Sequence, residues 1–163
     1  MNAYDVAGWK DFFVGTIGAS AGLLGLLFVA ISINLQEILR YRHLPGRAAG
    51  TLGILLAALL VSGVGLAPGQ SAVVFGVEVA VIGAAVLFQA FWVTRGKRDP
   101  TEPISWNLEH RVIGSVPGVT FLVGSLIVMA GGGGGLYWLM AGILLAFVVA
   151  SINAWVLLVE ILR

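Results

Sequence analysis

The stretch FFVGTIGASAGLLGLLFVAISINLQ, residues 12–36, decides the fold of this chain. It contains no charged side chain, and Asp11 and Glu37 stand just outside its two ends. A helix rises ~1.5 Å per residue and the hydrocarbon core of a bilayer is ~30 Å thick, so about 20 apolar residues suffice to cross it. The stretch therefore predicts a membrane-spanning helix.

Four further apolar stretches are long enough to cross a bilayer. They cover residues 48–66, 71–94, 112–130 and 136–159. None of them alternates apolar and polar residues with the period of two that a barrel strand needs, so we expect closed helices. The sequence predicts one all-α domain, residues 1–163, built as an integral membrane bundle of five transmembrane helices.

Glycine and proline mark the breaks between the predicted spans. Residues 67–70, Ala-Pro-Gly-Gln, predict a tight turn, and the five glycines at 131–135 form helix poorly. The one long polar loop is expected at residues 95–111, where Pro100 and Pro103 should keep the backbone irregular.

Composition excludes several classes of protein. The chain is 59% hydrophobic and 10% charged, with a mean hydropathy of +1.00, whereas globular domains carry roughly 25% charged residues. A net charge of +1 gives no reason to expect nucleic-acid binding, and the absence of cysteine excludes disulfides and thiolate ligands. No phosphate-binding loop followed by lysine and no His-Glu-x-x-His pair is present. We therefore expect no enzyme activity, no cofactor and no metal site.

The basic residues predict how the chain crosses the membrane. Lysine and arginine concentrate in the short loops on the cytoplasmic side. With five spans and the N-terminus outside, Lys10 alone lies outside, and the cytoplasmic side receives Arg40, Arg42, Arg47, Arg95, Lys97, Arg98, Arg111 and Arg163. We expect the C-terminus and the 95–111 loop to be cytoplasmic. Because Asp5 and Asp11 leave no basic start for a signal peptide, we expect the first span to stay in the mature chain.

Glu78 is the most informative single residue for function. It lies seven positions into the third predicted span, roughly 10 Å from the outer end. An ionisable group at such a depth is a candidate for function by default. Glu78 is therefore a candidate for an ion or proton pathway, as one carboxylate of a ring in an oligomer. The structural alternative is a hydrogen bond from Gln70, Ser71 or the loop backbone.

Polar side chains also recur near the opposite end of the spans. Residues 28–34 (FVAISIN) resemble residues 147–153 (FVVASIN), which indicates either an internal duplication or a chance match in an apolar alphabet. The polar intramembrane residues at this depth are Asn34, Gln89, Asn153, Ser32 and Ser151. Neutral amides there commonly hold helices together by hydrogen bonds of about 0.6 kcal/mol, so we favour that role over a solute site.

Four glycines in the first span share one helical face. Gly15, Gly18, Gly22 and Gly25 are spaced three, four and three residues apart. Small residues at this spacing let another helix approach closely in lipid. We predict a helix-packing interface, and favour packing against a helix of the same chain over packing against another subunit.

The segment Trp9-x-x-Phe12-Phe13, followed by Gly18-Ala19-Ser20-Ala21, and the C-terminal stretch from Asn153 to Glu160 resemble a family of small multi-pass membrane proteins of actinobacteria. The resemblance extends over most of the chain and implies location in a bacterial plasma (inner) membrane.

These observations favour a homo-oligomeric ion channel or small-solute permeation protein whose pathway lies between subunits. The alternative is a non-transporting accessory or regulatory subunit of a larger membrane complex. The expected partners are the lipid bilayer, further copies of the chain and a second membrane protein. Lipid or quinone binding between helices stays open, because apolar grooves leave no signature in sequence.

Overall fold

A computed structural model describes residues 6–40, 44–93 and 104–161, with side chains over residues 8–40, 44–92 and 112–155. A short 3-10 helix, η1 (Val6–Trp9), leads into the first α-helix. The α-helices are α1 (Lys10–Ile33), α2 (Leu35–Arg40), α3 (Leu44–Gly65), α4 (Ala72–Val93), α5 (Ile104–Met129) and α6 (Gly135–Ile161).

Five of these helices are long and apolar enough to cross a membrane: α1, α3, α4, α5 and α6. The all-α fold with five candidate membrane-spanning helices is therefore confirmed for the described part of the chain. Large apolar side chains on its surface, such as Leu26, Phe28 and Val81, are 64–72% exposed. They would be unfavourable in water but suit contact with lipid.

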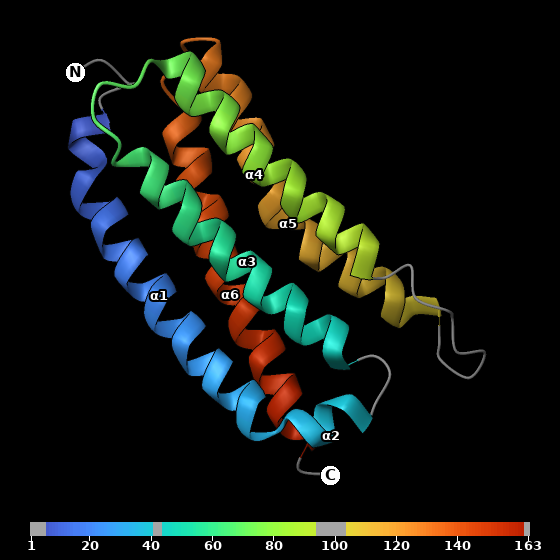
Figure 1. Ribbon diagram of the computed structural model, residues 1–163. Coiled ribbons are helices and arrows are strands. Elements are labelled where there is room, and N and C mark those ends of the chain that lie inside the picture. The colour runs from blue at the N-terminus through green and yellow to red at the C-terminus, as the bar shows by residue number, and fades with distance from the viewer. Residues whose placement is uncertain (1–5, 41–43, 94–103, 162–163) are drawn as a thin grey trace.

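Four helices form an up-and-down bundle, and α1 lies outside it (Figure 1). Helix α3 packs on α4, α4 on α5, α5 on α6, and α6 returns to α3. Helix α1 packs mainly against α3 and touches α6 over a small area. As a result, α1 and α6 run in the same direction on one side of α3, and α4 lies on the other side.

The core of the bundle is filled by apolar side chains. Phe121, Val79, Val61 and Ile143 come from four different helices and are completely buried. Phe13 of α1 joins the same cluster from outside the bundle. Because lipid is as apolar as these side chains, the packing gains its free energy from close van der Waals contact.

The two turns predicted from glycine and proline are confirmed. Helix α3 ends at Gly65, and Gly69 adopts φ +72° before α4 begins. Helix α5 ends at Met129, and Gly131 adopts φ +74° before α6 begins at Gly135. Both glycines occupy the left-handed region, which residues with a Cβ rarely enter.

Several helix ends differ from the sequence prediction, among them the start of α3, which begins at Leu44 and not at residue 48. The first span was expected to continue to Gln36, but α1 ends at Ile33, and the amide N–H of Asn34 donates to the carbonyl oxygen of Ala30. The short α2 then leads away in a new direction. The prediction of a loop over residues 95–111 is wrong for its second half, because α5 already begins at Ile104.

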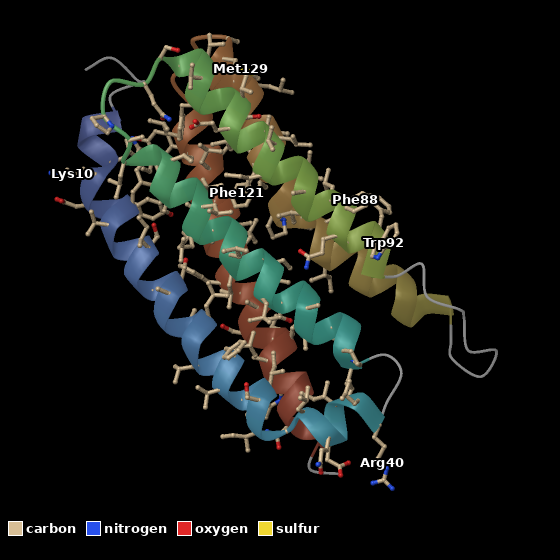
Figure 2. All side chains as sticks on the ribbon, in the orientation of Figure 1. Lys10, Arg40, Phe88, Trp92, Phe121 and Met129 are labelled. Carbon is tan, nitrogen blue, oxygen red and sulfur yellow. The ribbon has the colours of Figure 1, made fainter. Side chains whose placement is uncertain are left out.

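Each end of the bundle carries a basic residue and a pair of aromatic rings. Lys10 and Arg40 lie at opposite ends (Figure 2). Near Lys10, the Trp9 ring meets the ring of Tyr137 edge to face, with 4.9 Å between centroids. Near the opposite end, the rings of Phe88 and Trp92 are stacked at 5.5 Å. Aromatic residues at both ends are typical of side chains at the two membrane–water interfaces.

Candidate functional site

The carboxylate of Glu78 is held by the turn that precedes α4. Gln70 Nε2 donates a hydrogen bond of 2.6 Å to Glu78 Oε2, and both side chains are half-buried. Gln70 lies in the turn between α3 and α4, so this bond fixes the carboxylate at that end of the bundle. The hydrogen bond from Gln70, which was the structural alternative predicted for Glu78, is therefore present.

Glu78 shares a helical face with Gln89. Eleven residues correspond to about three turns, so the two side chains lie in line along α4. Gln89 Nε2 donates a 2.8 Å hydrogen bond to the Ala49 carbonyl oxygen of α3, and the Gln89 side chain lies directly against Gly53. This face of α4 is therefore the one toward α3, and Glu78 lies at the α3–α4 seam.

The intramembrane amides do not form one cluster. Gln89 joins α4 to α3, which confirms the expected role as helix-to-helix glue at that position. Asn34 instead bonds within its own segment, from Nδ2 to the Ala30 carbonyl oxygen at 2.9 Å. Asn153 is half-buried in α6. No hydrogen bond joins any two of these three amides in the described side chains.

The two serines of this group face outward. Ser32 is exposed and donates to the Phe28 carbonyl oxygen at 2.8 Å, which satisfies its hydroxyl within α1. Ser151 is exposed on α6. Neither serine extends a polar path into the bundle.

The glycine face of α1 points away from the other helices in the described part of the chain. Gly15, Gly18, Gly22 and Gly25 are all exposed, and a Cβ added at any of them would meet nothing within 4 Å. The buried side of α1 carries Ser20 and Leu27 among others. Two residues turn a helix by about 200°, so Gly18 and Gly25 lie opposite these buried positions. Packing of this face against a helix of the same chain, the favoured expectation, is therefore wrong.

Close glycine contacts within the chain occur between other helices, at positions that were not predicted from the sequence. A Cβ on Gly83 of α4 would lie 3.1 Å from the Gly118 carbonyl oxygen of α5, and the reverse distance is 3.0 Å. Gly124 of α5 and Gly135 of α6 approach each other in the same way. The signal was available, because Gly114 and Gly118 have the spacing of a small-residue packing motif.

The buried polar residues in the described part of the chain all carry hydroxyl groups. They are Thr16, Ser20, Thr51, Ser62, Thr120 and Ser125. Most of them donate to a carbonyl of the preceding turn, as Thr51 does to Arg47 and Ser125 to Leu122. Among them only Thr16 and Ser62 contact each other in the described residues, so these hydroxyls do not form a hydrated route through one copy of the described bundle.

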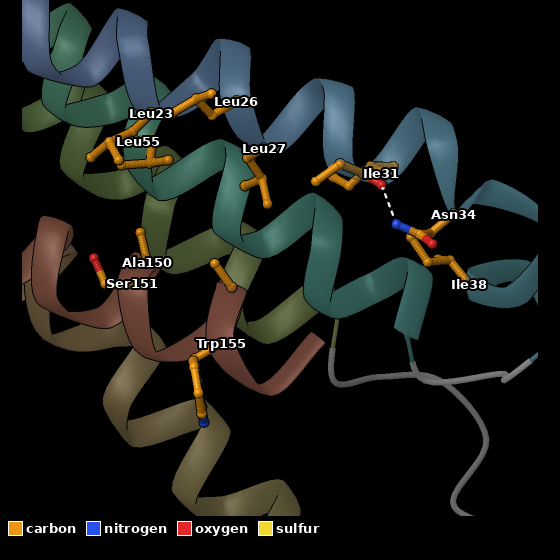
Figure 3. Close-up of a pocket in the computed structure, with 12 residues that line it drawn as sticks. Leu23, Leu26, Leu27, Ile31, Asn34, Ile38, Leu55, Ala150, Ser151 and Trp155 are labelled. Atoms are coloured by element: carbon orange, nitrogen blue, oxygen red, sulfur yellow. Dashed lines mark hydrogen bonds between the residues drawn. The ribbon is translucent and has the colours of Figure 1, made fainter. Parts of the chain in front are cut away.

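A groove of about 370 Å³ separates α1 from α6. Its walls are apolar residues of α1, such as Leu23 and Leu27, and Ala150 of α6, while Leu55 of α3 forms the floor. Figure 3 shows Asn34 and Ile38 together at one end and Leu23 far from them. The groove exists because α1 and α6 pack separately on α3 and scarcely touch each other.

Comparison with known proteins adds no relative to this arrangement. No protein-family model, curated protein or solved structure matches the chain.

Proposed function

We propose that the protein is a homo-oligomeric permeation protein, assembled by contact between the glycine face of α1 and α4 of the next copy. The observation that carries the proposal is the outward direction of that face, defined by Gly15, Gly18, Gly22 and Gly25. In lipid, a surface of small residues gains free energy when another helix packs closely on it.

The outward side of α4 has a complementary shape. Val77, Val81 and Phe88 form a row of large side chains that are 49–64% exposed. Helices α1 and α4 start at the same end of the bundle and run in the same direction. Counted from their first residues, Gly15 lies at the depth of Val77, and Gly18 within one residue of Val81. A row of large side chains fits a groove of small ones.

Such a contact uses two different surfaces of each copy. Helices α1 and α4 lie on opposite sides of α3. A head-to-tail contact between different surfaces generates a ring when its rotation closes. We therefore expect a cyclic assembly whose axis is normal to the membrane.

The permeation role rests on Glu78. Glu78 lies at the α3–α4 seam, next to the outward row of Val77 and Val81 on α4. The proposed contact between copies would therefore place one carboxylate of each copy around the ring. Rings of carboxylates attract cations in cation channels. Because the bundle core is filled by apolar side chains such as Phe121 and Val79, the route would run between subunits.

Two measurements test this function separately. Native mass spectrometry of the protein from mild detergent is expected to show a discrete homo-oligomer. Cation flux into liposomes is expected from the wild type and should fall at least several-fold in Glu78→Gln, which keeps the size of the side chain and removes its charge. Glu37→Gln is the matched control, because Glu37 lies in α2 at the other end and pairs with Arg40 at 3.5 Å.

The results also separate the alternative function. A monomer that carries an unrelated membrane protein and gives no flux would support the non-transporting accessory role, with the α1 face bound to that partner. Equal flux from the wild type and Glu78→Gln would remove Glu78 from the mechanism. We further propose, from the resemblance and the arginine distribution, a bacterial plasma membrane with the N-terminus outside.

A further inference from the structure

We propose that the groove between α1 and α6 binds one acyl chain of an anionic phospholipid, with the lipid head group at the arginine-rich end of the bundle. The groove lies between two membrane-spanning helices, and its α1 wall is built mainly from Leu23, Leu26, Leu27 and Ile31. The inference stands apart from the proposed oligomer, because Leu23, Leu27 and Ile31 lie on a different face of α1 from the glycines, and Leu26 lies at the border between the two faces.

The shape of the groove suits a slender apolar group. Its volume of about 370 Å³ lies at the lower end of the range of roughly 300–1,000 Å³ typical of small-molecule pockets. That is room for one alkyl chain and too little for a whole lipid or a second helix. The groove stays open because several lining residues are small: Ala30 on α1, and Ala150 and Ala154 on α6. Larger side chains at these positions would fill the space.

Two polar side chains line the groove, Ser151 of α6 beside Ala150 and Asn34 at one end, and the end at Asn34 leads to the charged part of the chain. Leu23 and Leu26 line the end toward the middle of α1, whereas Asn34 lines the end where α1 gives way to α2 (Figure 3). Trp155, which is 69% exposed, also lines the groove from the later part of α6. An amphiphile would therefore place its apolar tail beside the leucines and its head group beyond Asn34.

The charge at that end selects the head group. Between residues 34 and 50 the sequence has Arg40, Arg42 and Arg47 against the single acid Glu37. The Arg40 side chain is 72% exposed and lies on the short helix that also contributes Ile38 to the groove. Arginines near a membrane surface attract anionic lipids, by about fivefold in affinity for each residue.

The test uses the purified protein in mild detergent and native mass spectrometry. Phosphatidylglycerol and phosphatidylcholine with identical chains are added separately, and the lipid retained per protein chain is counted. We expect one phosphatidylglycerol per chain, bound at least fivefold more tightly than phosphatidylcholine. Ala30→Trp and Ala154→Trp fill the groove from its two walls, and each should weaken retention at least tenfold.

Val119→Trp is the matched control, because Val119 is 47% exposed on α5, away from the groove. It should retain lipid as the wild type does, and helical circular dichroism verifies that all three variants fold. Because two variants fill the groove, the test remains valid if one of them fails to fold.

Retention by Ala30→Trp and Ala154→Trp at the level of Val119→Trp would overturn the groove as the site. Equal retention of the two lipids would overturn the anionic head group. A lipid-free wild-type dimer that Ala30→Trp converts to a monomer would show that a second copy occupies the groove.

Discussion

Thr16 Oγ1 of α1 and Ser62 Oγ of α3 lie 2.7 Å apart, and both residues are buried. Each hydroxyl also lies within hydrogen-bond distance of a carbonyl in its own helix: Thr16 of Phe12 at 2.9 Å and Ser62 of Ala58 at 2.8 Å. One hydroxyl therefore donates across the interface and the other donates within its helix. This contact joins the peripheral helix to the bundle.

The first prediction concerns that contact. Thr16→Val and Ser62→Ala should each destabilise the protein, and the double variant should lose less than the sum of the two. The coupling free energy should be about 0.6 kcal/mol and no more than ~1.7 kcal/mol, the range of such bonds in membrane helices. Equilibrium unfolding in mixed micelles measures it, and strictly additive losses would show that the hydroxyls do not interact.

The second prediction uses a neighbouring buried hydroxyl. Ser20 Oγ is completely buried on α1 and has no hydrogen-bond partner in the described residues. A buried polar group without a partner costs about 1–3 kcal/mol. Ser20→Ala should therefore leave the free energy of unfolding unchanged or raise it by about 1 kcal/mol, in contrast to Ser62→Ala in the same assay. A clear loss of stability in Ser20→Ala would reveal a partner for the hydroxyl.

The third prediction separates two kinds of glycine. Gly83→Ala places a Cβ 3.1 Å from a backbone oxygen of α5, which cannot move as a side chain could, so a loss of about 1–3 kcal/mol is expected. Gly18→Ala makes the same chemical change where nothing lies within 4 Å. It should leave the stability of the monomer unchanged or improve it slightly through helix propensity. The opposite order of the two losses would contradict the packing described here.

The fourth prediction concerns Gln89, whose side chain lies across Gly53 and donates to the Ala49 carbonyl oxygen at 2.8 Å. Gly53→Ala should displace this amide and break the bond, because the new methyl group would occupy its place. Gln89→Leu removes the same bond directly. Thermal unfolding of the double variant should therefore resemble that of Gly53→Ala alone, and fully additive shifts would mean that the two sites act independently.

The fold could be predicted from the sequence because membrane helices have a simple signal. Long apolar stretches and glycine or proline breaks follow directly from the thickness of the bilayer and from backbone geometry. The end of α1 at Asn34 was missed, since its side chain offers a local hydrogen bond to Ala30 that hydropathy does not register. The start of α5 at Ile104 was missed because its first two turns mix polar and charged residues with apolar ones and therefore lack the continuous apolar run of a span.

The candidate site was only partly predictable. Glu78 and Gln70 were named together, since both stand close in sequence and at one end of a span. The direction of the α1 glycines was not predictable, because a face of small residues looks the same whether it meets the same chain or another. The groove was invisible for a related reason: its leucines and alanines come from helices that are far apart in sequence.

Covalent cross-linking tests the central claim, the contact between α1 of one copy and α4 of the next. The chain has no cysteine, so Gly18→Cys and Val81→Cys can be introduced singly and together without any background. Under oxidation in native membranes, the double variant should form a ladder of covalent multimers, and each single variant should stay monomeric. A covalent dimer from Gly18→Cys alone, or no product from the double variant, would contradict the proposed assembly.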